Sequence, residues 1–227
     1  MFKWSYILRY LPRVIQVVPV TLLIVAVAMA AGIILGMVIT FFRVEKVPIL
    51  RQFSVVFVSF IRGTPMLVQL FVVYYGLPAL FMLFGINILR VNRLFFVFVT
   101  YGLNSAAFLS ETFRSAIGSI DKFQWDAAAS IGLTRMQTYI RVIIPQSVVI
   151  AIPSVGTSLS SLLQDTSLAF AIGVIDIVGK INSMSASLGH SLEGYTIAAV
   201  IFIALSFGIE RTFALLEKKT RTQNEAV

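Results

Sequence analysis

Residues 126–145 read DAAASIGLTRMQTYIRVIIP and form a polar excursion in an otherwise very apolar chain. Their spacing is Asp126-Ala127-Ala128, three residues, Gly132, nine residues, and then Val142-Ile143-Ile144-Pro145. Alanine is the best helix former, so the residues before the glycine predict a short, stiff helix. We expect Gly132 to end this helix with a left-handed backbone, and Pro145 to stop a return strand before the next apolar run.

The composition places the chain in a membrane. Of its 227 residues, 58% are hydrophobic and 12% are charged, against roughly a quarter charged in soluble domains. The net charge of +8 comes from basic residues that lie between apolar runs, not in one stripe, which argues against nucleic-acid binding. The chain has no cysteine, so disulfides, thiol catalysis and zinc–thiolate sites are excluded.

Five apolar runs can each cross a bilayer, which takes roughly 20 residues. We expect one domain over residues 1–227, with spans at about 14–42, 53–78, 93–115, 146–166 and 194–214 and a cytoplasmic coupling loop at 119–145. Pro65, in the sequence Arg62-Gly63-Thr64-Pro65, must break or kink the second span. The polar residues 164–167 predict that the fourth helix is followed by a shorter segment. The prediction is an all-α integral membrane protein with termini on opposite sides.

The basic residues predict the orientation of these spans. With the N-terminus outside and the C-terminus in the cytoplasm, the inner side holds twelve of the 18 Lys and Arg residues and the outer side six. Cytoplasmic loops carry such an excess. Residues 2–13 have an amphipathic pattern and are expected along the outer interface. The 126–145 loop then lies in the cytoplasm.

Several further stretches resemble the signatures of one family, the polar-amino-acid ABC permeases. They are FIRGTPMLVQ at 60–69, ETFR at 111–114, SIDK at 119–122, QWDAA at 124–128 and LQDTSL at 163–168. The 126–145 spacing resembles that family's EAA loop, which reads Glu-Ala-Ala, three residues, Gly, nine residues, Ile-x-Leu-Pro. Here Asp126 replaces the usual Glu, and Val142 and Ile144 replace the usual Ile and Leu. The resemblance covers residues 16–215 in the family's order.

This resemblance implies the type I ABC importer permease fold in a bacterial cytoplasmic membrane, crossed several times. The implied partners are ABC ATPase subunits, an extracytoplasmic amino-acid-binding protein, a second permease copy or paralogue, and the lipid bilayer, but no nucleic acid. In the family the EAA loop docks on the ATPase. The residues expected to couple ATP to transport are therefore Asp126, Ala127, Ala128, Gly132 and Pro145.

The chain is expected to be no enzyme and to bind no cofactor or metal itself. No Gly-x4-Gly-Lys-[Ser/Thr], His-Glu-x-x-His or Gly-x-Ser-x-Gly occurs, so ATP and Mg²⁺ would bind to the partner ATPase. His190 is the one histidine, and a structural or solvated role is expected for it. The alternative functions are a stand-alone secondary transporter or channel for small polar solutes, and a membrane anchor or sensor subunit. Broken helices also suit secondary transporters, but such a protein has no use for a docking loop.

Charges within apolar runs are costly and usually face protein or water. Glu111 and Arg114 are three residues apart and can form an ion pair on one helical face. Arg62 lies beside the Gly-Thr-Pro break, where freed carbonyls and water could solvate it. Two roles are open for Arg62: support of the bend, or direct contact with substrate.

A polar stripe leads to a carboxylate in the fourth span. Counting back from Asp165, Ser161, Ser158 and Ser154 lie at offsets of four, seven and eleven residues, with Gln164 beside them. These offsets share one face of a helix and predict a hydrated substrate pathway, where Asp165 could meet a substrate ammonium group. The alternative is close helix packing through small residues four apart, such as Gly156 and Ser160. The sequence leaves open both the amino acid (cystine, a basic amino acid or glutamine) and the choice between homodimer and heterodimer.

Overall fold

The chain folds into helices throughout the part that the computed structural model describes, residues 2–225, with side chains described for 2–187 and 189–220. In chain order the elements are α1 (Trp4–Ile15), α2 (Val18–Val44), α3 (Leu50–Gly63), α4 (Met66–Phe71), the π-helical η1 (Val72–Gly76), α5 (Leu77–Met82), α6 (Arg93–Gly118), α7 (Lys122–Ser130), α8 (Arg135–Thr138), the π-helical η2 (Tyr139–Ile143), α9 (Ile144–Asp165), the 3₁₀-helical η3 (Thr166–Ile172), α10 (Ile177–Leu188) and α11 (Ser191–Glu225).

Four of the described segments are long and apolar enough to cross a membrane. They are Val18–Val44, Arg93–Gly118, Arg135–Ile172 and Ser191–Thr220. A fifth candidate is the pair Leu50–Gly63 and Met66–Met82, whose two halves are bent by 114°. The number of spans therefore agrees with the predicted five if this bent pair counts as one span.

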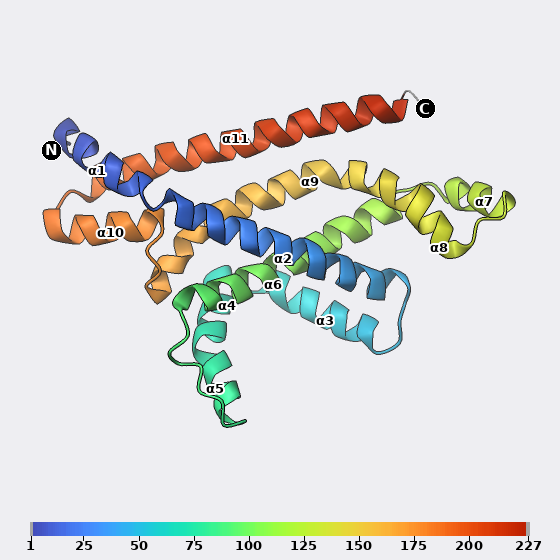
Figure 1. Cartoon of the computed structure of the whole chain (residues 1–227), viewed down its shortest axis with the longest axis horizontal. Helices are drawn as coiled ribbons and strands as arrows, with labels where there is room; N and C mark the ends of the chain where they lie inside the picture. The colour runs from blue at the N-terminus through green and yellow to red at the C-terminus, as the bar shows by residue number, and fades with distance from the viewer. Residues whose placement is uncertain (1, 226–227) are drawn as a thin grey trace.

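The spanning helices run along the long axis of the molecule (Figure 1). The N-terminus and α10 lie at one end of this axis, and the C-terminus and the α7–α8 segment lie at the other. Termini at opposite ends are what an odd number of spans requires. The predicted arrangement, with the 126–145 segment and the C-terminus at the same end, is present in the fold.

Two glycines allow α2 to pack closely on α6, the most extensive helix pair in the structure. A Cβ added at Gly32 would lie 2.5 Å from the Ser105 Cβ, and one at Gly36 would lie 3.2 Å from the Ala106 carbonyl oxygen. Small residues four apart on one helix bring helix backbones together in this way. The main core forms around this contact and includes Ile24, Phe96, Tyr101 and Leu163.

The predicted break at Pro65 is confirmed, and a glutamine stabilises it. The buried Gln69 amide nitrogen donates to the carbonyl oxygens of Ile61 at 2.7 Å and Thr64 at 2.9 Å. Its own oxygen accepts a hydrogen bond of 2.9 Å from the Asn104 side chain on α6. The carbonyls freed at the break are therefore satisfied by Gln69, not left open to solvate Arg62.

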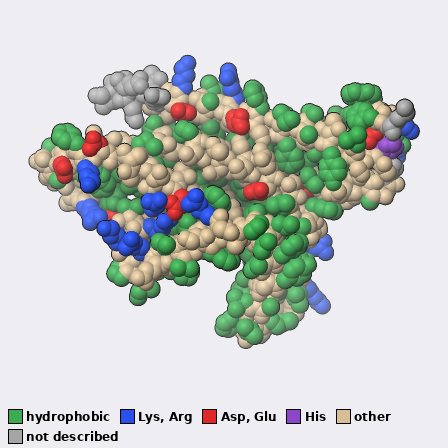
Figure 2. Space-filling view, turned by 180° about the vertical axis from the view of Figure 1, so that it is seen from behind, with side chains coloured by type: hydrophobic (Ala, Val, Ile, Leu, Met, Phe, Trp, Pro, Cys, Tyr) green, Lys and Arg blue, Asp and Glu red, His purple; other side chains and the backbone are tan. Residues whose placement is uncertain are grey.

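Beyond the break, α4, η1 and α5 form an arm that projects away from the other helices (Figure 1). Figure 2 shows the arm covered largely by hydrophobic side chains. At its tip, Leu83 is 81% exposed and Phe84 is 75% exposed. A surface of this kind is stable in lipid or against another apolar surface, not in water.

The structure has three features that the sequence does not predict. Residues 177–188 form the short helix α10, between the predicted fourth and fifth spans. Asp176 caps its start, because the Asp176 Oδ1 accepts a 2.7 Å hydrogen bond from the Gly179 amide. The helical segment that contains the predicted fourth span begins at Arg135, because α8, η2 and α9 are continuous. Helix α1 packs its Tyr10 and Val14 into a small core with α10 and α11.

Candidate functional site

Helix α7 ends where the sequence predicts, at a glycine with a left-handed backbone. Gly132 has a φ of +78°. Its amide donates to the Ala129 carbonyl at 2.9 Å, and the Leu133 amide donates to the Ala128 carbonyl at 3.1 Å. This pair of bonds is the Schellman arrangement, which favours glycine because an L side chain is strained there. At the other end, Asp121 caps the helix by accepting from the Phe123 amide at 2.9 Å.

A second helix starts immediately after this turn. The Thr134 hydroxyl accepts from the Gln137 amide at 3.3 Å, and the Gln137 side-chain oxygen accepts from the Thr134 amide at 2.9 Å. This reciprocal capping box begins α8. Residues 126–137 are therefore not one continuous helix. They belong to two helices joined at residues 131–134, which we call the hairpin (α7 and α8 with their turn).

The prediction of a return strand before Pro145 is wrong. Residues 139–143 form a π-helical turn that leads directly into α9, and Pro145 is the second residue of that helix. Proline is tolerated in the first turn of a helix, where its missing N–H costs least. The wider π-turn before it accommodates the change in hydrogen-bond register.

The hairpin exposes apolar side chains that the sequence analysis did not single out. Phe123 is 72% exposed, Ile131 76% and Met136 64%. Of the predicted coupling residues, Asp126, Ala127, Gly132 and Pro145 are exposed, whereas Ala128 is buried. The signal available in the sequence was the occurrence of large apolar residues within a polar, capped segment.

Aromatic and polar contacts hold the base of the hairpin. The rings of Trp125 on α7 and Tyr139 on η2 meet edge to face, with centroids 4.9 Å apart. The Gln146 amide donates to the Gln124 side-chain oxygen at 3.4 Å. Helix α7 is thereby fixed to the beginning of the fourth span, which is the geometry a lever requires.

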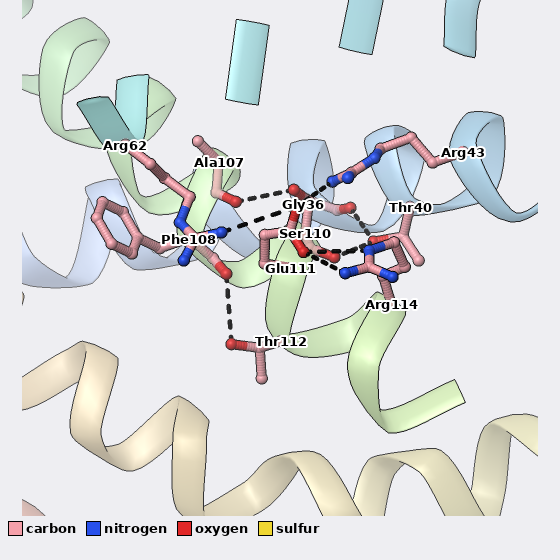
Figure 3. A network of polar contacts seen from close by, with 10 residues as sticks. All are labelled: Gly36, Thr40, Arg43, Arg62, Ala107, Phe108, Ser110, Glu111, Thr112 and Arg114. Atoms are coloured by element: carbon pink, nitrogen blue, oxygen red, sulfur yellow. Dashed lines mark hydrogen bonds and ion pairs between the residues drawn. The ribbon is translucent and has the colours of Figure 1, made fainter. Parts of the chain in front are cut away.

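Near this end, one carboxylate joins three helices (Figure 3). The predicted pair is confirmed, because Arg114 Nη2 lies 2.7 Å from Glu111 Oε2. Arg43 on α2 adds a second ion pair, with its Nη1 2.6 Å from Glu111 Oε1. Arg62 on α3 completes the cluster, with its Nη1 3.8 Å from Glu111 Oε1. We call these four residues the Glu111 cluster.

Within this cluster Arg62 contacts helix α6. Its guanidinium carbon lies 5.6 Å from the Phe108 ring centroid, a cation–π arrangement on α6. Among the described residues, none of the contacts of Arg62 involves the polar stripe of α9. The structure therefore does not bring Arg62 together with Asp165 and the serines.

The stripe on α9 lies on the open face of its helix. Ser154, Ser161 and Gln164 are exposed, and Ser158 and Asp165 are half-buried. The Ser158 hydroxyl donates to the Ser154 carbonyl of its own helix at 2.9 Å, so it serves no neighbouring helix. Asp165 makes no ion pair with Lys180 or any other cation in the described part of the chain.

The small residues Gly156 and Ser160 lie on another face, which packs inside the protomer. A Cβ at Gly156 would lie 2.8 Å from the Phe213 ring of α11, and Ser160 is 7% exposed. The sequence leaves helix packing and a substrate pathway open as alternatives for the small and polar residues of α9. The structure separates them onto two faces of α9. Phe213 covers Gly156 on one face, and three of the five residues on the face that ends at Asp165 are exposed.

His190 packs against Tyr6 and Glu193. Its ring stacks on Tyr6 with centroids 3.7 Å apart, and its Nδ1 lies 3.2 Å from Glu193 Oε1. In the part of the chain that the structure describes, no three His, Asp or Glu side chains come together as a metal site would need. The chemistry of the site is thus that of docking surfaces, ion pairs and a polar helix face.

Comparison with known proteins identifies the family. The family described as "Binding-protein-dependent transport system inner membrane component" matches residues 28–222. The L-cystine transport system permease protein TcyL of Bacillus subtilis is 39% identical over 97% of this chain and 92% of its own length. The glutamine transport system permease protein GlnP of Escherichia coli K12 is 30% identical over 97% of this chain and 98% of its own.

Solved structures agree with this assignment. One described as an amino acid ABC transporter with histidines has a TM-score of 0.87 and 26% identity, covering 96% of this chain and 99% of that one. An inward-facing MetNI methionine ABC transporter has a TM-score of 0.73 at 17% identity, covering 91% and 95%, and shows the shared fold. The chain is a multi-pass membrane protein that belongs to the family of inner membrane components of binding-protein-dependent transport systems, among the amino-acid ABC permeases.

Proposed function

We propose that this chain is the transmembrane subunit of an ATP-driven importer that carries a polar amino acid across the bacterial cytoplasmic membrane. The observation that carries the proposal is the hairpin. It is capped at both of its helices, it projects at the same end as the C-terminus, and it presents Phe123, Ile131 and Met136 to the outside. A rigid apolar projection outside the spans is suited to dock into a groove of another protein.

The proposed occupant of that surface is an ABC ATPase subunit, in keeping with the ABC permease relatives. The end that carries the hairpin must then be cytoplasmic. On the face drawn in Figure 2, most Lys and Arg side chains lie over this end, which supports that orientation. ATP and Mg²⁺ belong to the partner, since the chain has no Gly-x4-Gly-Lys-[Ser/Thr] sequence to cradle phosphates.

The path of the motion follows from the covalent order of the elements. When ATP draws two ATPase subunits together, the docked hairpin moves with them. Trp125 and Tyr139 tie α7 to η2, and η2 continues into α9 without a break. Helix α9 carries the stripe that ends at Asp165, so a movement of the hairpin reorients the polar face. Transport then alternates between outward and inward access.

The polar stripe of α9 is suited to contact a zwitterionic substrate. Asp165 offers a negative charge to an ammonium group, and Gln164, Ser161, Ser158 and Ser154 offer polar groups along the same face. Because this face is open in the single protomer, a second permease copy or paralogue is proposed to close the pathway from the other side. An extracytoplasmic binding protein would deliver the amino acid to the opposite end. Relatives that carry cystine and glutamine support a polar amino acid.

The docking proposal is tested by exchanging the exposed apolar side chains for serine. Full burial of such a side chain contributes about 1.5–3 kcal/mol, so Phe123→Ser and Met136→Ser should each weaken ATPase binding about tenfold or more. Co-purification of the ATPase with the permease from detergent measures it. Leu83→Ser is the matched control, since Leu83 is more exposed than Phe123 and Met136 but lies on the arm.

Wild-type levels of bound ATPase in both hairpin variants would exclude the hairpin as the docking surface. Amino-acid uptake by the permease alone, in liposomes without ATPase or ATP, would instead establish a stand-alone carrier.

A further inference from the structure

The turn between α2 and α3 has an unusual backbone. Lys46 has a φ of +53° and Ile49 a φ of +66°, and these are the two non-glycine residues with positive φ in the described part of the chain. A β-branched residue is strongly disfavoured in this region. Ile49 is 79% exposed, so burial does not compensate for the strain. Strained turns of this kind concentrate at sites that change conformation.

An ion pair connects this turn to the hairpin. Glu45, which caps the end of α2, lies at 3.1 Å and 3.2 Å from Arg135 Nη2 through its two carboxylate oxygens. Arg135 is the first residue of α8, and the pair joins positions 90 residues apart in the chain. Among the described residues, no other ion pair or hydrogen bond links α7 or α8 to the α2–α3 turn.

Tyr139 connects helix α7 to this ion pair. Its side chain interacts with both Glu45 and Arg135, and its ring meets Trp125 of α7. A displacement of α7 therefore acts on Glu45 through two aromatic rings as well as through the turn of the hairpin.

The helices on both sides of the α2–α3 turn contact the Glu111 cluster. Arg43 is two residues before Glu45 on α2 and contacts Glu111 on α6. Arg62, at the far end of α3, contacts the same carboxylate. A movement of the α2–α3 turn therefore reaches the ends of three spanning elements, α2, α3 and α6.

We propose that Glu45 and Arg135 are positioning residues of energy coupling, which transmit the movement of the hairpin to the strained α2–α3 turn and so to the Glu111 cluster. The inference rests on the proposed function, and it adds a second route beside the direct one through α9. The Arg135 side chain is 70% exposed and that of Glu45 21%. An exposed ion pair contributes little to stability and breaks readily, which suits a contact that changes between states.

The test uses the assembled transporter in liposomes, with its ATPase subunits and binding protein, and measures amino acid imported per ATP hydrolysed. Glu45→Gln and Arg135→Gln should each lower this ratio at least threefold, while ATPase subunits co-purify as in the wild type. The charge reversal Glu45→Arg with Arg135→Glu rebuilds the pair and should restore most of the ratio. Arg141→Gln is the matched control, because Arg141 is exposed next to the hairpin and makes no ion pair among the described residues.

Each result decides one question. A wild-type transporter without ATP-driven uptake would refute the proposed function itself. If the wild type is coupled and the single variants match it, the proposed function stands and the role of the pair is overturned. Single variants that the charge reversal fails to rescue also overturn it, since another property of these residues would then matter. Loss of ATPase co-purification would assign the pair to assembly instead of coupling.

Discussion

Replacing Gly132 tests whether the left-handed backbone at the end of α7 is needed for coupling, without changing the exposed side chains of the hairpin. A Cβ at this position would meet no atom within 4 Å, so a substitution introduces no clash. The whole effect comes from the backbone, whose φ of +78° costs an L-residue about 1–2 kcal/mol. A free energy of this size shifts the balance between the closed and the frayed end of α7 by about 5- to 30-fold.

The expected outcome is a graded loss of substrate-stimulated ATP hydrolysis in the reconstituted transporter. Asparagine visits the left-handed region more readily than other residues, and a β-branched side chain tolerates it least. The order of coupling should therefore be Gly132, then Gly132→Asn, Gly132→Ala and Gly132→Val. The permease should still reach the membrane, because the hairpin lies outside the apolar spans.

Gly118 provides the control for this series. It is the last residue of α6 at the same end of the molecule, has open space around its Cβ position and has no positive φ. Gly118→Val should leave coupling near the wild-type value. Full coupling in Gly132→Val, or an equal loss in Gly118→Val, would refute the argument that the left-handed end of α7 is needed for energy transfer.

Three further predictions concern topology, substrate and pH. Ser5→Cys in this cysteine-free chain should react with an impermeant thiol reagent in intact cells, and Gln137→Cys only after permeabilisation; labelling at 137 from outside would reject the orientation. Asp165→Asn should lower substrate affinity of the membrane part about tenfold to a hundredfold, with the binding protein unaffected, because a charge-assisted hydrogen bond is lost; unaltered uptake kinetics in an assembled complex would exclude this contact. Burial raises the pKa of the Asp176 carboxyl above its usual 3.8, outweighing the opposing hydrogen bonds from backbone amides of residues 176, 178 and 179. The charged form therefore destabilises the fold at neutral pH, and stability is gained as the pH falls through the raised pKa. Asp176→Asn keeps the oxygen that caps α10 and should melt at the same or a higher temperature than the wild type at about pH 8, with the gap closing on acidification; a gap that widens at low pH would contradict it.

The spans, the broken second helix and the end of α7 could be predicted from the sequence because each depends on neighbouring residues. Apolar length decides whether a segment can cross a bilayer. The missing N–H of Pro65 breaks the helix in which it lies, and Gly132 adopts a backbone conformation that is available to glycine in any fold. The Glu111–Arg114 pair follows equally from a spacing of three residues on one helix.

The contacts that assemble the site depend on which helix faces lie together, and no local pattern encodes this. Gln69 satisfies carbonyls up to eight residues before it and also binds α6, so its role appears only when the two helices are in place. The two sets of small residues on α9 look alike in the sequence, yet Phe213 of α11 covers one face and leaves the other open. Pro145 was expected to end a strand, but continuity with η2 makes it part of a helix. The sequence by itself determined a membrane permease with a capped polar loop, because hydropathy and backbone preference act locally. The tertiary structure alone decided that Glu45 meets Arg135 and that three arginines share Glu111, because those contacts join residues that only helix packing brings together.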